Sequence, residues 1–122
     1  MNEAVDVLVV LILIEHLIFL ILEMFLWTRP IGMKIFLMTK KEAEATKVLA
    51  SNQGLYNGFL SMGLIWALLY PDPELSKELM LFFLGCISIA GIYGGISVKK
   101  IIFYIQALPA LICIILILIV SA

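Results

Sequence analysis

The sequence contains 122 residues, of which 64% are hydrophobic and only 14% are charged, with a net charge of −1. A soluble domain is roughly 45–50% apolar and about 25% charged, so this chain has too few polar side chains for a water-facing surface. Lipid is the expected solvent, and only helices or closed barrels can span it. The apolar runs are continuous instead of alternating, which excludes barrel strands and predicts an all-α membrane protein.

Four stretches approach the roughly 20 apolar residues that are needed to cross the hydrocarbon core of a bilayer. They cover about residues 5–27, 52–70, 79–98 and 101–120. The first two stretches end near Pro30 and Pro71, because proline interrupts a helix. The last two are separated only by residues 97–100, which indicates a tight hairpin. We therefore predict one polytopic membrane domain over residues 1–122, built as a bundle of four transmembrane helices.

The first loop, residues 28–51, is the longest connection and is expected to have structure of its own. Residues 31–38 are too few to cross a membrane and too apolar to lie freely in water, which predicts an interfacial segment. Thr39 and Glu42 have the spacing of a capping box, in which two side chains accept hydrogen bonds from free amides at the start of a helix. No proline follows before Pro71, so this helix should continue into the second span.

The basic residues are distributed unevenly between the predicted loops. Seven of the eight lie in the first and third loops, namely Arg29, Lys34, Lys40, Lys41, Lys47, Lys99 and Lys100. Only Lys77 lies in the second loop. Because cytoplasmic loops carry the excess of lysine and arginine, the first and third loops are predicted to be cytoplasmic. Both termini are then expected on the non-cytoplasmic side of the cell membrane.

The first span contains three ionisable side chains, those of Glu15, His16 and Glu23. An acidic residue at the centre of a membrane helix costs roughly 2.5–3.5 kcal/mol, so it normally faces a partner or a cavity. At about 100° per residue, Glu23 lies almost directly above His16, and Glu15 lies on an adjoining face. Two interpretations stay open for Glu15: a hydrogen bond that joins helices, or a carboxylate that carries a proton or binds a ligand.

The second span begins with a cluster of amide and hydroxyl side chains at the same expected depth as Glu23. These groups either join helices through hydrogen bonds or line a polar pocket, and we predict a pocket that Glu23, Arg29 and Lys47 close. The predicted ligand site comprises Glu15, His16, Glu23, Asn52, Gln53, Tyr56 and Asn57.

Two seams of small residues predict close helix packing, Gly54 with Gly58 in the second span and Gly91 with Gly95 in the third. Four short helices with two such seams have more interface than one bundle needs, which predicts a homo-oligomer. In the fourth span, Pro109 frees a backbone carbonyl that Gln106 either satisfies or leaves for the pocket.

Motifs for cofactors and metals are absent from the sequence. It has no phosphate-binding glycine loop, no HExxH and no CxxC. Cys86 and Cys113 fall within predicted spans, where cysteine serves as a small apolar residue. The basic first loop lacks the interleaved aromatic residues of a nucleic-acid site. We therefore predict no cofactor, no metal and no nucleic acid; the expected partners are the lipid bilayer, further copies of the chain and a small amphipathic ligand.

Two strings resemble domain-of-unknown-function family 1304, a family of small bacterial four-helix integral membrane proteins. They are Glu15-His16 followed by Leu22-Glu23-Met24-Phe25-Leu26-Trp27-Thr28, and the segment 47–58. The resemblance extends over essentially the whole chain. It implies the same four-span architecture and carries no activity with it.

Two weaker similarities supply alternative functions. Four spans with a glutamate in the first are similar to the small multidrug-resistance transporters, which implies proton-coupled transport with Glu15 in the exchanging role. Lys47 followed by Asn52 is similar to the membrane-associated eicosanoid and glutathione enzymes, which implies an inter-subunit site, although their arginine-rich motif is absent here. A structural or accessory subunit is the third alternative. The principal expectation is binding of a small amphipathic or lipid-like molecule in a polar intramembrane pocket.

Overall fold

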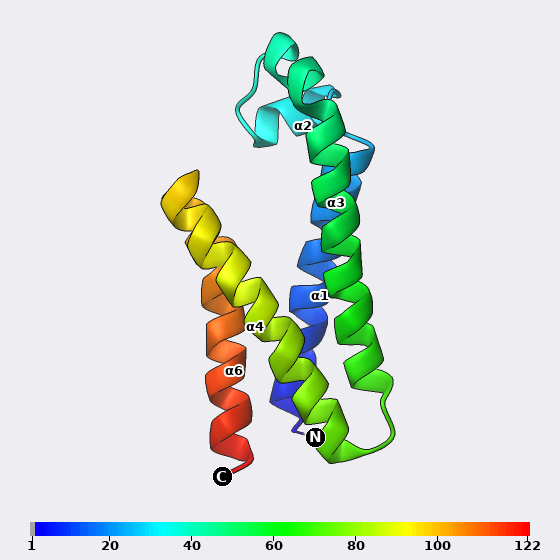
Figure 1. Cartoon of the computed structure of the whole chain (residues 1–122), viewed down its shortest axis with the longest axis vertical. Helices are drawn as coiled ribbons and strands as arrows, with labels where there is room; N and C mark the ends of the chain where they lie inside the picture. The colour runs from blue at the N-terminus through cyan, green and yellow to red at the C-terminus, as the bar shows by residue number, and fades with distance from the viewer. Residues whose placement is uncertain (1) are drawn as a thin grey trace. The chain divides into compact units, whose positions relative to one another are not determined.

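The computed structural model describes residues 2–122, and all regular secondary structure in that part of the chain is helical. The elements in chain order are α1 (Glu3–Met24), α2 (Pro30–Ile35), α3 (Lys40–Leu69), α4 (Pro73–Ser97), α5 (Lys100–Ile102), the π-helical turn η1 (Phe103–Ala107) and α6 (Leu108–Val120) (Figure 1). The predicted all-α class is therefore confirmed.

Three helices within residues 2–122 are long and apolar enough to cross a membrane. They are α1, α4 and the helix Lys100–Val120 that α5, η1 and α6 form together. The 30-residue helix α3 does not reach the same apolar content, because Asn52, Gln53 and Asn57 lie in the stretch that was expected to span. Three helices of this length and composition indicate a multi-pass membrane protein.

The outer surface of α6 is apolar, as a lipid-facing helix must be. Ile112, Ile115, Leu118 and Ile119 are each exposed over half or more of their surface. Side chains of this kind on adjacent turns form a continuous apolar strip, which soluble proteins avoid on such a scale. The strip is therefore evidence for lipid as the surrounding solvent.

The helix boundaries follow from local capping. The Thr39 backbone N–H donates to Glu42 Oε2 over 3.1 Å, and the Glu42 N–H donates to Thr39 Oγ1 over 3.2 Å, which confirms the predicted capping box. At the start of α4, Asp72 Oδ1 accepts hydrogen bonds from the N–H groups of Glu74 and Leu75, each over 3.0 Å. Both caps use side chains within three residues, so the sequence alone is sufficient to specify them.

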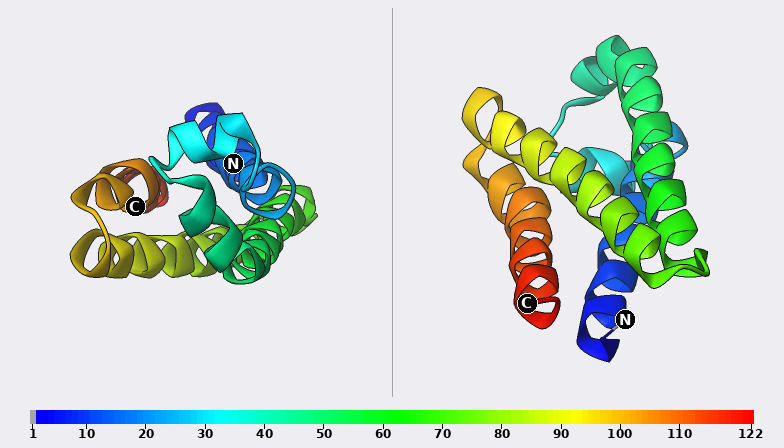
Figure 2. Two further views of the ribbon diagram at one scale, coloured as in Figure 1. Left: turned by 90° about the horizontal axis from the view of Figure 1, so that it is seen from above. Right: turned by 60° about the horizontal axis from the view of Figure 1, so that its bottom comes forward.

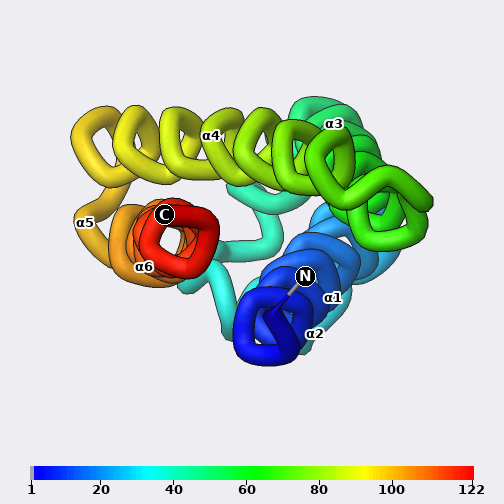
Figure 3. The backbone as a smooth tube through the Cα atoms, turned by 90° about the horizontal axis from the view of Figure 1, so that it is seen from below, coloured from blue at the N-terminus to red at the C-terminus, as the bar shows by residue number. Residues whose placement is uncertain are grey.

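The helices group into two compact units, one of residues 2–13 with 62–122 and the other of residues 14–61. In the first unit, α4 packs along η1 and α6 as an antiparallel hairpin (Figures 2 and 3). A Cβ on Gly91 would lie only 2.4 Å from the Ala107 nitrogen, and one on Gly95 would lie 2.7 Å from Phe103 Cβ. The predicted glycine seam of the third span is therefore confirmed as a packing surface.

The π-helical turn η1 ends at Ala107, two residues before Pro109. Proline has no N–H to offer the carbonyl four residues earlier and its ring clashes with that carbonyl. In this chain the helix has a wider, π-helical turn before the proline, in which the Leu108 N–H donates to the Phe103 carbonyl five residues earlier. Gln106, which was expected either to satisfy the freed carbonyl or to face a pocket, lies within this turn.

Candidate functional site

The candidate site lies in the second unit, where the end of α1 packs against α3 (Figure 1). Two glycines of α3 allow this close approach. A Cβ on Gly54 would lie 2.7 Å from Met24 Cγ and 3.1 Å from the Leu20 carbonyl oxygen. A Cβ on Gly58 would lie 2.6 Å from Leu20 Cδ1. The predicted seam of Gly54 and Gly58 is thus a contact surface between α3 and α1, and a larger residue there would push the helices apart.

A hydrogen bond between polar side chains joins these two helices. Asn57 Nδ2 donates to Glu23 Oε1 over 2.5 Å. Asn57 is only 4% exposed, and Glu23 is half-buried. A buried amide without a partner costs about 1–3 kcal/mol, so the bond removes that penalty and fixes the direction of the Glu23 carboxylate.

A pocket of about 530 Å³ opens beside this hydrogen bond. Its polar lining comes from Glu23, Thr28, Lys47, Ser51 and Asn52, and its apolar lining comes from Met24, Phe25, Trp27, Val48 and Leu55. A carboxylate, an ammonium group and an amide therefore share one concave surface with aliphatic and aromatic side chains. This volume and this mixed lining are typical of sites for small molecules.

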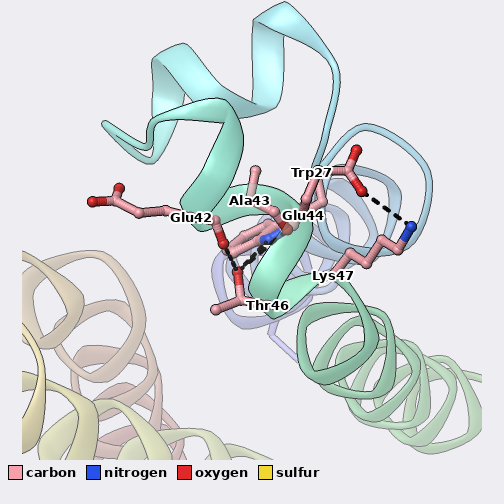
Figure 4. Close-up of polar contacts among 6 residues, drawn as sticks. All are labelled: Trp27, Glu42, Ala43, Glu44, Thr46 and Lys47. Carbon is pink, nitrogen blue, oxygen red and sulfur yellow. Dashed lines mark hydrogen bonds and ion pairs between the residues drawn. The ribbon is translucent and has the colours of Figure 1, made fainter.

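The rim of the pocket is held by what we call the tryptophan cap, formed by Trp27, Phe36 and Thr46. Trp27 Nε1 donates to Thr46 Oγ1 over 3.0 Å, and Thr46 Oγ1 donates to the Glu42 carbonyl over 2.8 Å (Figure 4). The Trp27 and Phe36 rings pack with centroids 4.7 Å apart. The cap therefore ties the end of α1 and the residues after α2 to the first turns of α3.

A tight approach brings α2 back onto the end of α1. A Cβ on Gly32 would lie 1.9 Å from the Leu26 carbonyl oxygen, so glycine alone fits at this position. Of the two basic residues that were predicted to close the pocket, Lys47 lines it and Arg29 does not. Lys47 also forms an ion pair with Glu44 over 3.1 Å on the exposed side of α3 (Figure 4).

The structure brings three of the seven predicted site residues together. Glu23 and Asn52 line the pocket, and Asn57, which is not part of the lining, donates a hydrogen bond to Glu23. Gln53 and Tyr56 are exposed on α3 outside the pocket lining. The Tyr56 ring packs edge to face on Phe59 with centroids 5.6 Å apart.

Glu15 and His16 lie earlier in α1 and do not line the pocket. His16 is fully buried, with its ring centroid 5.7 Å from that of Phe19. Glu15 Oε1 is buried and has no hydrogen-bond partner among residues 2–122. The predicted site therefore divides into a pocket at the end of α1 and a second ionisable position within the helix.

Among the lining residues that were not expected from the sequence are Ser51 and Leu55 of α3. They follow Lys47 at intervals of four residues, so a helical projection of α3 would have placed them on the same face as Lys47 and near Asn52. Phe25 and Thr28 had no such signal, because they lie beyond the last residue of α1 and their positions depend on the turn into α2.

Fold and pocket define the class of the protein: a small all-α chain with three membrane-length helices and an amphipathic pocket between α1 and α3. Residues 10–118 match the family described as "Protein of unknown function (DUF1304)", and the chain belongs to this family. The family resemblance of the two strings is thus confirmed.

The chain is also similar to the uncharacterized protein YpaA of Lactococcus lactis subsp. lactis (strain IL1403). The two are 31% identical over 96 residues, which cover 77% of this chain and 79% of that protein. No solved structure matches the chain. These similarities therefore show the family and assign no activity to it.

Proposed function

We propose that this protein is a four-span membrane protein that binds a small amphipathic or lipid-like molecule in the pocket between α1 and α3. The observation that carries the proposal is the lining of that pocket. Glu23, Lys47 and Asn52 offer one acceptor, one cation and one amide for a polar head. Trp27, Val48 and the other apolar lining residues offer a surface for a hydrocarbon or ring portion, whose burial contributes about 25 cal/mol per Å².

The polar groups of the pocket are suited to binding because they are held in advance. The Glu23 carboxylate is oriented by Asn57, so little side-chain freedom is lost when a ligand donates to it. Lys47 forms an exposed ion pair with Glu44, and such pairs contribute roughly 0–1 kcal/mol. Its ammonium group is therefore available to an anionic head at small cost.

The proposed topology makes α3 the fourth span. Helix α3 begins in the basic loop and its last turns, from Met62 to Leu69, are predominantly apolar. The excess of basic residues supports a cytoplasmic position for the α1–α3 and α4–α5 connections, with both termini outside. With this orientation the pocket lies near the cytoplasmic headgroups, and the apolar helix α2 lies in the interface beside it. We further propose that the chain assembles as a homo-oligomer.

A second candidate function is proton-coupled transport through Glu15. The observation that favours it is the buried Glu15 Oε1, which has no hydrogen-bond partner among residues 2–122. Intramembrane ionisable residues commonly mark proton or substrate pathways. Under this alternative, Glu15→Gln abolishes pH-dependent release of a ligand from reconstituted protein and leaves the oligomer intact. If Glu15→Gln dissociates or unfolds the protein, Glu15 serves assembly and the transport alternative is wrong.

Native mass spectrometry of the gently solubilised protein tests the binding proposal. We expect a discrete mass other than bulk lipid on the wild type. It should be lost from Asn52→Leu, whose side chain lines the pocket, and retained by Gln53→Leu, whose side chain is exposed beside it. Equal retention by both variants, or a wild type that carries nothing beyond bulk lipid, would contradict ligand binding in this pocket. The same spectra report the number of subunits.

A further inference from the structure

A separate pocket of about 290 Å³ lies within the first unit, at the turn between α3 and α4. We call it the aromatic pocket; it is lined by Trp66, Tyr70, Leu75, Glu78 and Leu79. Two of its walls are aromatic rings and a third carries a carboxylate. The function proposed above does not use any of these residues.

The turn that forms the aromatic pocket is held by two direct contacts. Ser76 Oγ donates to the Ala67 carbonyl over 2.7 Å, which joins the first turn of α4 to the last turn of α3. Further along, the Phe83 ring packs against the bare backbone of Gly63, where a Cβ would lie only 2.3 Å from Phe83 Cε1. These two contacts hold the last turns of α3 against the first turns of α4, the two segments that carry the lining residues.

The aromatic walls are arranged at an angle to each other. The rings of Trp66 and Tyr70 have centroids 6.3 Å apart and planes inclined by 68°. Trp66 is 54% exposed, so its ring is accessible from outside. The face of an aromatic ring carries negative electrostatic potential and attracts a cation, most strongly for tryptophan.

The carboxylates of this turn have different roles. Asp72 accepts the two hydrogen bonds that cap α4, and Glu74 forms an ion pair with Lys77 over 2.6 Å. Lys77 is the only basic residue between positions 48 and 98. Glu78 takes part in neither of these contacts and lines the aromatic pocket. The charge that remains at the pocket is therefore negative.

We propose that the aromatic pocket binds a compact organic cation of the quaternary ammonium class, held between the ring of Trp66 and the carboxylate of Glu78. An ammonium group with several methyl groups is weakly hydrated, so it loses little on entering a site with aromatic walls, and the carboxylate compensates its charge. A metal ion or a primary ammonium group would lose more hydration for the same contacts.

The cation has two chemical sources, a free quaternary amine or the choline headgroup of a phospholipid. In the proposed four-span topology this turn lies at the non-cytoplasmic interface, where tryptophan and tyrosine rings meet headgroups. The binding chemistry is the same for both sources. Only the source depends on the topology, so the pocket itself does not depend on the function proposed for α1 and α3.

Calorimetric titration of the purified full-length protein with tetramethylammonium tests the proposal. We expect saturable binding to the wild type that is about threefold to tenfold weaker in Glu78→Gln and in Trp66→Leu. The double variant Glu74→Gln, Lys77→Gln is the matched control, because it removes both members of an ion pair that does not line the pocket and leaves the net charge of the turn unchanged; it should bind like the wild type. Trp66→Phe, which keeps an aromatic face, should bind more tightly than Trp66→Leu.

Circular dichroism of each variant separates a lost site from a lost fold, and Trp66→Phe with Glu78→Gln remain informative if Trp66→Leu does not fold. Absence of saturable binding to the wild type, or an equal effect of the double variant Glu74→Gln, Lys77→Gln and of Glu78→Gln, would overturn the proposal. Nanodiscs of phosphatidylcholine and of phosphatidylglycerol distinguish the sources. If phosphatidylcholine competes with tetramethylammonium and phosphatidylglycerol does not, the headgroup is the ligand; if neither competes, it is a free amine.

Discussion

At the scale of single residues, the hydrogen bond between Asn57 and Glu23 orients a carboxylate of the pocket before a ligand binds. A glutamate in a membrane helix needs a partner, and the amide of Asn57 supplies it from α3. The same bond fixes the carboxylate that lines the pocket. Removing either side chain therefore affects both the stability of the second unit and the shape of the site.

Substitution of Asn57 should destabilise the protein. Asn57→Ala leaves the Glu23 carboxylate without its donor, and we expect a loss of about 1–3 kcal/mol in the free energy of unfolding. Titration with a denaturing detergent, followed by circular dichroism, measures this loss. The exposed neighbour Gln53→Ala is the control and should change stability by less than about 0.5 kcal/mol. Equal effects of the two substitutions would show that the bond between α1 and α3 does not contribute.

The hydrogen bond of the tryptophan cap between Trp27 and Thr46 should contribute measurably to stability. Trp27→Phe removes the N–H that donates to Thr46, and Thr46→Val removes the acceptor, so each should cost about 0.5–1.5 kcal/mol. The double variant should cost less than the sum of the two, because both changes remove one interaction. Hydrogen exchange of residues 28–39 reports the same loss as faster exchange. Strict additivity of the two costs would contradict the hydrogen bond.

At the scale of elements, much of the structure was predictable because it depends on local or periodic signals. The capping box of Thr39 and Glu42 lies within one helical turn, and the seam of Gly54 and Gly58 has a helical period. Both were predicted and both are present. The polar residues of α1 and α3 were also expected to meet at one depth, as Glu23 and Asn57 do.

The remaining features depend on distant or ambiguous causes. Trp27 and Thr46 are 19 residues apart, and their contact depends on the path of the chain through α2. Pro109 predicts an irregular turn in the last helix, but the sequence around it does not distinguish a kink from the π-helical turn that is observed. The sequence around Gly32 does not predict that the Leu26 carbonyl lies so close to it.

Packing between α4 and the last helix gives a prediction with a matched control. Gly91→Ala places a methyl group 2.4 Å from the Ala107 nitrogen and should cost about 1–3 kcal/mol through overpacking. In contrast, a Cβ on Gly85 would meet nothing in residues 2–122 within 4 Å apart from its chain neighbours and the backbone of its own helix, so Gly85→Ala should be neutral or stabilise the helix by up to about 1 kcal/mol. Both variants are compared by the same detergent titration. A harmless Gly91→Ala would mean that α4 and η1 are farther apart than described.

At the scale of the whole molecule, the proposed topology is open to a direct labelling test. The native cysteines are first replaced in Cys86→Ala and Cys113→Ala, and single cysteines are then introduced by Lys41→Cys, Glu74→Cys and Ser121→Cys. We expect a membrane-impermeant maleimide to label positions 74 and 121 in intact cells, and position 41 only after permeabilisation. Equal labelling of positions 41 and 74 in intact cells would show that α3 does not cross the membrane.

The whole-molecule account depends on whether the pocket between α1 and α3 holds a defined molecule, and photo-crosslinking in living cells tests that most directly. A photoreactive residue is introduced at Leu55, which lines the pocket, and as a control at Phe59, which is exposed one turn further along α3 outside the lining. The account predicts one dominant adduct mass at position 55, absent at position 59 and lost when Asn52→Leu is added. The same mixture of bulk lipid adducts at both positions would contradict it.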